Sequence, residues 1–355
     1  IQEAMRRRVD HPVFGYTFAS NDYREAFRSW QERRNGWRIA EDALLYAPGV
    51  MPAVRAAILT CTDPGDEIVV QPPVYFPFFD AIRENDRVVV ENPLAAEPGA
   101  RTDAADRAGA AGVRYRMDLD HLESVITPKT RMLILCSPHN PVGRIWTRDE
   151  LERLAAVCLN RDLIVVSDEI HSDIRRAGIP FVPFASVGPE AAARTIVCNS
   201  PSKTFNIAGI ASSHVVVADA ERRSALSATF SRLGMTLPNI LALEASRAAF
   251  TESEAWVDAL LEYLDEQIAW FVAEITRRFG SGPEADILVS PIEGTYLAWL
   301  DLRPLLRRCG ARHADAEHAL LEEAALWLSD GREFGAQADG FFRMNLATPR
   351  TNVEE

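Results

Sequence analysis

The segment Leu163-Ile164-Val165-Val166-Ser167-Asp168-Glu169-Ile170-His171 joins an apolar, mostly β-branched run directly to a polar cluster. A continuous apolar run of this kind is typical of a strand that is buried on both faces of a parallel sheet. Similar runs recur, with helix-like stretches between them, at residues 67–70, 87–90, 131–136, 195–198 and 214–217. This alternation predicts an α/β fold in which a mostly parallel central sheet carries helices on both faces.

Two further patterns divide the chain. Thr147 and Glu150 have the spacing of a capping box, which predicts that a helix begins there. After about residue 238 the alternation ends, and long helical stretches are followed by strand-like segments at residues 294–300 and 340–346. We therefore expect a large domain at residues 41–240 and a smaller α+β domain made of residues 1–40 and 241–355. Residues 95–112, rich in Ala, Gly, Asp and Arg, are expected to form a mobile surface insertion.

The composition excludes several classes of protein. With 355 residues, of which 47% are hydrophobic, the chain can bury a core without disulfides or metal ions. It carries 38 basic and 51 acidic residues, and a net charge of -13 argues against binding to nucleic acid or to an anionic membrane. The five cysteines form no CxxC pair and suit a reducing compartment, so we expect the cytoplasm.

Polar clusters follow three of the predicted strands directly, at residues 137–144, 168–173 and 200–206. The carboxyl ends of the strands are where ligands bind in an open α/β sheet, so these clusters should converge on one pocket. Together they offer an amine at Lys203, a carboxylate at Asp168, an amide at Asn140, an imidazole and several hydroxyls.

This combination matches the chemical needs of pyridoxal 5′-phosphate. The cofactor needs a lysine amine for its aldehyde and a carboxylate for its pyridine nitrogen. Its phosphate is bound well by hydroxyls and by the free N–H groups at a helix N-terminus. The stretch Tyr46-Ala47-Pro48-Gly49-Val50-Met51-Pro52-Ala53 provides such a turn and helix start.

The sequence resembles the fold-type I pyridoxal-phosphate enzymes of the class I/II aminotransferase superfamily, and within them the MalY/PatB branch of cystathionine β-lyases. The resemblance runs almost from end to end. It is carried by Ser200-Pro201-Ser202-Lys203-Thr204-Phe205-Asn206 and by residues 14–17, 46–50, 71–79, 138–144, 167–173, 293–296 and 342–345. It implies an aspartate aminotransferase-like fold, a homodimer with the active site at the interface, and a small amino acid as substrate.

The resemblance also implies roles for residues around the cofactor ring. Lys203 would form the Schiff base with the cofactor and then move the proton. Asp168 would pair with the pyridine nitrogen, while Asn140 and His171 would approach the phenolate oxygen. Tyr75 would stack on the ring face, and Lys203, Asp168 and Tyr75 would make up the catalytic set.

Further roles concern the phosphate and the substrate. Arg343 is expected to hold the substrate's α-carboxylate in a bidentate grip that lysine could not reproduce. Tyr16 is expected to reach the phosphate of the neighbouring subunit. The phosphate-binding set is completed by Ser200, Ser202 and the backbone amides of Val50 and Met51.

Structural explanations compete with several of these roles. Tyr75 could serve core packing, Arg343 a structural ion pair, and Tyr16 packing at an interface. Asp168 and Glu169 could cap a helix. His171 with Asp173, or Cys136 with His139, could suggest a metal site, but neither pair has the ligand spacing of zinc, so no metal is expected.

The expected activity is α,β-elimination on L-cystathionine or a related S-substituted L-cysteine, which gives a thiol (homocysteine from cystathionine), pyruvate and ammonia. An aminotransferase could use the same residues. A regulatory protein that keeps the fold without turnover is a third interpretation, because a fold does not dictate its use.

Overall fold

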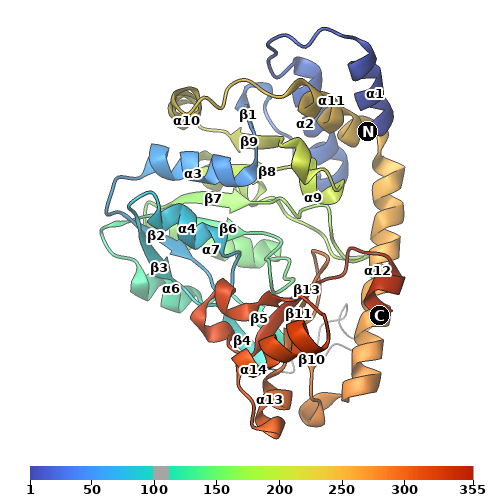
Figure 1. Cartoon of the computed structure of the whole chain (residues 1–355). Coiled ribbons are helices and arrows are strands. Elements are labelled where there is room, and N and C mark those ends of the chain that lie inside the picture. Colours follow the sequence, from blue (N-terminus) through green and yellow to red (C-terminus); the bar gives the residue numbers. More distant parts are fainter. Residues whose placement is uncertain (99–111, 355) are drawn as a thin grey trace.

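The computed structural model describes residues 1–98 and 112–354, and its centre is a seven-stranded sheet (Figure 1). The strand order is β1-β9-β8-β7-β6-β2-β3. Strands β3, β2, β6, β7 and β8 run parallel, whereas β9 is antiparallel to both β8 and β1. The strand bounds are β1 (Leu44–Ala47), β2 (Glu67–Val70), β3 (Val88–Glu91), β6 (Thr130–Cys136), β7 (Ile164–Asp168), β8 (Thr195–Asn199) and β9 (Ser213–Val217).

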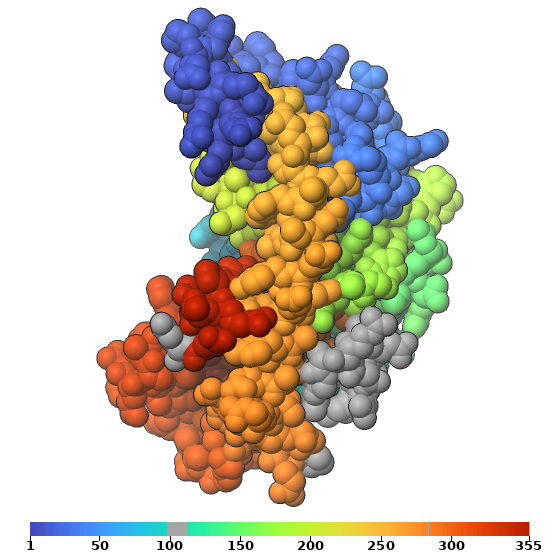
Figure 2. Space-filling view, turned by 90° about the vertical axis from the view of Figure 1, so that its right-hand side faces the viewer, coloured from blue at the N-terminus to red at the C-terminus, as the bar shows by residue number. Residues whose placement is uncertain are grey.

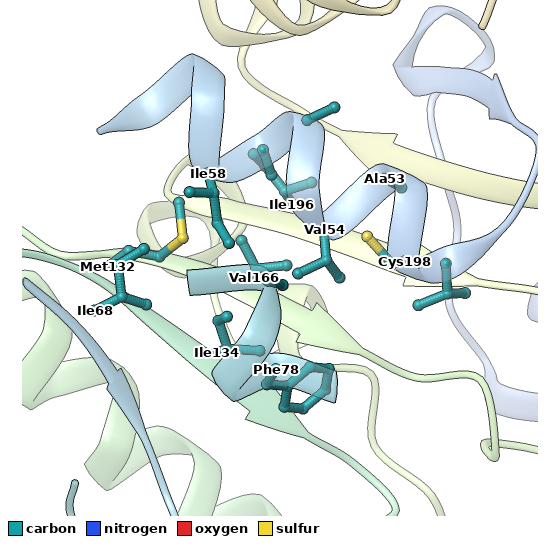
Figure 3. Packing of buried hydrophobic residues seen from close by; sticks show 14 of the residues in the cluster. Ala53, Val54, Ile58, Ile68, Phe78, Met132, Ile134, Val166, Ile196 and Cys198 are labelled. Atoms are coloured by element: carbon teal, nitrogen blue, oxygen red, sulfur yellow. The ribbon is translucent and has the colours of Figure 1, made fainter. Parts of the chain in front are cut away.

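Alternate side chains of the central strands enter different hydrophobic clusters. Ile134 and Val166 pack in a cluster with Val54 and Ile58 of α3, and Figure 3 shows these four side chains together. Leu133 instead belongs to a second cluster that contains residues of α7. Burial on both faces explains why these strands have continuous apolar sequences. The helices around the sheet are α3 (Val50–Cys61), α4 (Pro77–Arg83), α6 (Leu119–Val125), α7 (Arg148–Asn160), α8 (Pro189–Ala193), α9 (Pro201–Thr204) and α10 (Ala220–Arg232).

A second, smaller sheet is antiparallel and has the order β10-β11-β13-β12. Helix α12 (Glu254–Phe279) runs along one side of the molecule, past both sheets, and Figure 2 shows it in orange across that face. The other elements of this half are β10 (Leu288–Val289), β11 (Leu297–Asp301), α13 (Arg303–Cys309), α14 (His313–His318), β12 (Ser329–Asp330), β13 (Phe341–Asn345) and α15 (Arg350–Glu354).

Parts of both segments assigned to the small domain pack against the large sheet. Helices α1 (Gln2–Asp10) and α2 (Asn21–Asn35) contact α11 (Ile240–Glu252). Phe27 and Trp30 of α2 share a hydrophobic cluster with Val197 and Val216 of the large sheet. The division at residues 40 and 240 remains a prediction, and this packing places α2 and α11 against the seven-stranded sheet.

The predicted mostly parallel sheet with helices on both faces is confirmed, and so is the capping box of Thr147 and Glu150 at the start of α7. Three details differ. Strand β1 was not expected, and β9 is antiparallel although its sequence resembles that of the parallel strands. Strand β3 lies at the sheet edge, where Val88 is 48% exposed, so it is not buried on both faces.

The predicted insertion at residues 95–112 lies largely outside the described residues. Its first four residues are described, and they form strand β4 (Ala95–Pro98), which pairs antiparallel with β5 (Val113–Arg116). Residues 95–98 are therefore a strand and not a loop. None of the described helices has the length and apolar composition needed to cross a membrane.

Candidate active site

A cavity of about 490 Å³ lies where the three polar clusters meet. Asn140 follows β6, Asp168 ends β7 with His171 just beyond, and Ser202 and Lys203 follow β8 in α9. The predicted convergence is therefore observed, because parallel neighbouring strands end at the same sheet edge. The predicted residues that line this cavity are Val50, Met51, Tyr75, Asn140, Asp168, His171, Ser202, Lys203 and Arg343.

Asp168 carries a buried carboxylate with few partners. Its Oδ1 accepts a hydrogen bond from the backbone N–H of Ile170 at 3.1 Å, and no other described residue donates to this carboxylate. Burial raises the pKa of Asp168 to about 7, although the Ile170 N–H and the positive charge of Lys203 oppose the shift. A buried carboxylate of this kind would be stabilised by a cationic N–H donor in the cavity.

His171 faces the same cavity as a neutral imidazole. Burial lowers the pKa of His171 to about 3, and the positive charges of Lys203 and Arg343 lower it further. Its ring packs edge-on against Tyr296, with ring centroids 5.6 Å apart. Nδ1 is buried and has no partner among the described residues, so it can exchange a hydrogen bond with a ligand.

Arg343 lies on β13 and points its guanidinium across the cavity wall. Nη1 donates to Asn140 Oδ1 at 3.0 Å, and Nη2 donates to Ser329 Oγ at 3.0 Å. The guanidinium carbon lies 4.8 Å from the ring centroid of Phe334. No carboxylate of residues 1–98 or 112–354 lies within ion-pair distance of Arg343, so nothing there supports the structural ion-pair interpretation. The guanidinium can therefore bind an anionic ligand.

The N-terminus of α3 and the short helix α9 form another part of the wall. Val50 and Met51 are the first residues of α3, and their N–H groups have no acceptor within the helix. Ser202 and Lys203 line the cavity from α9. A hydroxyl, two free backbone N–H groups and an ammonium form a favourable environment for a phosphate group.

Tyr75 lies in an aromatic group beside the cavity. Its ring is 5.7 Å from Phe76 and 5.6 Å from Phe78, measured between centroids. Burial raises the pKa of Tyr75, and the negative charge of Asp168 adds to the shift. The side chain is therefore both packed against the core and exposed to the cavity, which is compatible with stacking on a bound ring.

Two predicted residues are not brought to this cavity. Ser200 is buried, and its Oγ donates to the backbone oxygen of Ser212 at 2.7 Å and accepts from Ser202 N–H at 3.1 Å. It thus caps α9, which fixes the start of the helix that carries Lys203. Tyr16 is 91% exposed in the segment before α2 and lies on no described cavity wall.

The sequence reasoning assigned no role to three residues that shape the site. Tyr296 lines the cavity beside His171, Cys136 lines it at the end of β6, and Ser329 holds Arg343. Tyr296 stood within a quoted motif, which was a usable signal. Ser329 had none, because it is brought next to Arg343 only by the pairing of β12 with β13.

Two of the residues considered as metal ligands, Asp173 and His139, have other partners. Asp173 accepts from Trp30 Nε1 and Thr204 Oγ1, each at 2.9 Å. His139 Nε2 lies 2.9 Å from the backbone oxygen of Pro73. These contacts give Asp173 and His139 structural roles.

One other described group, His313, Glu317 and Asp330, has metal-binding side chains close together. His313 Nδ1 accepts a hydrogen bond from the Gly340 N–H, and its Nε2 lies 2.9 Å from Asp330 Oδ1. Arg332 pairs with both carboxylates. The two carboxylates of this group therefore already have a cationic partner in Arg332.

Comparison with known proteins gives a consistent result. The family model described as "Aminotransferase class I and II" matches residues 4–355. The chain is 34% identical to cystathionine beta-lyase PatB of Bacillus subtilis and 33% identical to protein MalY of Escherichia coli, covering 100% of this chain and 86% and 85% of those proteins. Among solved structures, cystalysin from Treponema denticola, which contains a pyridoxal 5′-phosphate cofactor, superimposes with a TM-score of 0.89 at 31% identity. That match covers 99% of this chain and 84% of the cystalysin chain.

Proposed function

Because this chain belongs to the class I and II aminotransferase family, we propose that it is a pyridoxal 5′-phosphate-dependent carbon–sulfur β-lyase. Its substrate is L-cystathionine or a related S-substituted L-cysteine, and its products are a thiol, pyruvate and ammonia. The observation that carries the proposal is the meeting of Lys203, Asp168 and Arg343 in one cavity.

The residues of the cavity fit this cofactor. Asp168 has a buried carboxylate that lacks a cationic donor, and a protonated pyridine nitrogen supplies one. His171 Nδ1 is buried without a partner, and the cofactor's ring oxygen can provide it. Ser202 and the free N–H groups of Val50 and Met51 are suited to the phosphate.

When bound, the cofactor supplies an electrophilic aldehyde and a ring that delocalises the charge left when a Cα proton departs. Lys203 Nζ attaches the cofactor and is the base that accepts the substrate's Cα proton. Asp168 keeps a proton on the ring nitrogen, while Tyr75 covers the ring face and limits access of water.

Arg343 orients the substrate. Its two outer nitrogens are held by Asn140 and Ser329, so the planar guanidinium is fixed before the substrate arrives. A bidentate hydrogen bond to the α-carboxylate then selects α-amino acids and places Cα within reach of Lys203.

The proposal extends to assembly and location. Phe14, Tyr16 and Phe18 are 58%, 91% and 72% exposed in the segment before α2, and this surface supports a homodimer in which Tyr16 reaches the partner's cofactor phosphate. The three buried free cysteines, Cys136, Cys158 and Cys198, favour a reducing compartment such as the cytoplasm.

Product analysis tests the function. Purified protein with the cofactor and L-cystathionine should release pyruvate and homocysteine in equal amounts, and Lys203→Ala should release neither. A transaminase using the same site would instead convert an amino donor to its keto acid without producing free thiol. That outcome, or a lack of turnover in the wild type, would contradict the lyase proposal.

A further inference from the structure

A second cavity, of about 450 Å³, adjoins the active-site cavity. The two share Phe76 and Arg343 as lining residues. The rest of the second cavity is built by the chain from α14 to β13, which includes the π-helical turn Ala319–Glu323 and strand β12. A group bound at Arg343 is therefore next to both spaces.

The shared wall is held in place. Arg343 Nη1 donates to Asn140, which faces the active-site cavity, and Nη2 donates to Ser329, which faces the second one. Phe334 lies beneath the guanidinium and packs edge-on against Phe76, with ring centroids 5.6 Å apart. Arg343 and Phe76 are therefore held in fixed positions at the border of the two cavities.

Large apolar side chains form one side of the second cavity, and several are left in contact with water. Trp327 is 89% exposed, Leu321 is 49% exposed and Leu326 is 38% exposed. Exposed apolar side chains that cluster around a cavity are a mark of a ligand or partner site. Their place beside Arg343 favours a part of the same ligand that Arg343 holds.

The charges of the second cavity limit what that part can be. Glu317, Asp330 and Glu333 line it, and Arg332 pairs with the first two. Glu333 forms no ion pair with a residue of the described ranges. Arg343 also lines the cavity, but the substrate's α-carboxylate occupies it in the proposed enzyme, so a further anionic group would meet net negative charge.

We propose that the second cavity receives the group attached to the substrate's sulfur, that Trp327 favours an apolar substituent, and that the acidic residues of the cavity disfavour an anionic one. This inference rests on the proposed lyase function and specifies its preferred substrates. Trp327 acts here as a specificity-determining residue, because its indole covers the substituent and takes no part in proton transfer.

The test compares two substrates that differ only in this group, S-benzyl-L-cysteine and S-methyl-L-cysteine, by pyruvate release. Trp327→Ala should lower kcat/KM for the benzyl substrate about tenfold, the scale of a lost hydrophobic contact, and change that for the methyl substrate less than about twofold. Trp327→Phe should retain most of the benzyl preference. Trp256→Ala, a partly exposed tryptophan that lines neither cavity, is the matched control and should leave both values unchanged.

Two substrates with oppositely charged groups on sulfur test whether the cavity disfavours an anionic substituent. S-(2-aminoethyl)-L-cysteine should be a better substrate than S-carboxymethyl-L-cysteine, and Glu333→Gln should narrow that difference.

Equal effects of Trp327→Ala on the benzyl and methyl substrates, or no effect on either, would overturn the assignment of the cavity. The lyase function would still hold in that case, because the wild-type protein would release pyruvate. A wild-type protein that releases no pyruvate from any of the four substrates would overturn the function and this inference together.

Discussion

The guanidinium of Arg343 has two neutral partners, Asn140 and Ser329, and faces a cavity that also contains Lys203 and Asp168. A half-buried arginine with a purely structural role would be expected to pair with a carboxylate. The positive charge of Arg343 is instead available to a ligand. This arrangement supports a substrate that carries a carboxylate.

Replacement of Arg343 should therefore impair catalysis more than folding. Arg343→Ala should lower kcat/KM at least about tenfold, since charge-assisted hydrogen bonds contribute roughly 1.5–3 kcal/mol. Arg343→Lys should recover little, because an ammonium cannot present a planar fork. Steady-state kinetics and melting temperature are measured on the same preparations. A folded Arg343→Ala protein with wild-type kinetics would show that the carboxylate is bound elsewhere.

At the scale of residues, the sequence predicted most members of the cavity and failed where contacts depend on distant pairing. Lys203 and Asp168 follow strands directly, so their position could be inferred from strand order alone. Ser329 reaches Arg343 only through the small sheet. Ser200 stands in the expected motif, but its hydroxyl is used to cap α9, which a motif does not reveal.

The interface between α2 and β9 contains an unusual buried histidine. His214 is stacked between Tyr23 and Phe27, with centroid distances of 4.4 and 4.3 Å. Both of its ring nitrogens are buried without a hydrogen-bond partner in the described structure. Burial lowers the pKa of His214 to about 3. The ring is therefore neutral in the folded protein and acts as an aromatic spacer.

This histidine should make folding sensitive to acid. The unfolded chain binds the His214 proton near pH 6.5, whereas the folded chain does not until about pH 3. Stability relative to a His214→Phe variant should thus fall as pH drops below 6.5, by about 2 kcal/mol at pH 5. Urea unfolding of both proteins at pH 7.5 and pH 5 measures this difference. An identical difference at the two pH values would mean that His214 is protonated in the folded state.

At the scale of elements, the apolar runs predicted the positions of six strands but neither the direction of each strand nor its neighbours in the sheet. Strand β9 has the same β-branched composition as its parallel neighbours, and only hydrogen-bond pairing reveals that it is antiparallel. The four-residue strand β1 was hidden in a stretch identified for its turn and helix start. Helix starts were more predictable, since capping depends on local residues such as Thr147 and Glu150.

The two sheets are joined by a buried ion-pair network around Glu293. Its carboxylate accepts hydrogen bonds from Arg144 Nε at 2.8 Å, from Ile145 N–H at 3.0 Å and from Arg114 Nη2 at 3.1 Å. Arg144 follows β6 of the large sheet, whereas Glu293 precedes β11 of the small one. At the neighbouring Gly294, an added Cβ would lie 2.7 Å from Ile145 Cγ1, so the two chain segments approach closely. This contact positions Tyr296 in the cavity wall.

Removal of the Glu293 charge should destabilise the whole molecule. Glu293→Gln leaves the buried Arg144 with only Glu150 as its acidic partner, and loss of one member of a buried pair costs about 3 kcal/mol or more. The surface pair of Glu32 and Arg38 provides the control, and Glu32→Gln should cost less than about 1 kcal/mol. Denaturant unfolding measures both variants. Equal losses in the two would show that the Glu293 network does not hold the sheets together.

For the whole molecule, the alternation of apolar runs with helix-like stretches predicted the fold class. It did not predict how the N-terminal and C-terminal segments pack around the sheet. Nothing in residues 21–35 indicates that Phe27 and Trp30 pack beside Val197 and Val216, which lie more than 160 residues further along the chain. Such long-range packing depends on shape complementarity that local periodicity does not encode.

In the proposed enzyme Lys203 carries the cofactor, and the composition of the chain makes a direct test possible. Lys129 and Lys203 are its only lysines, and Lys129 is exposed after α6. Reduction of the holoenzyme with borohydride, followed by peptide mass spectrometry, should place one cofactor per chain on the peptide that contains Lys203. Lys129→Arg should be labelled as fully as the wild type. A label on the Lys129 peptide, or no label on either, would show that Lys203 does not carry the cofactor.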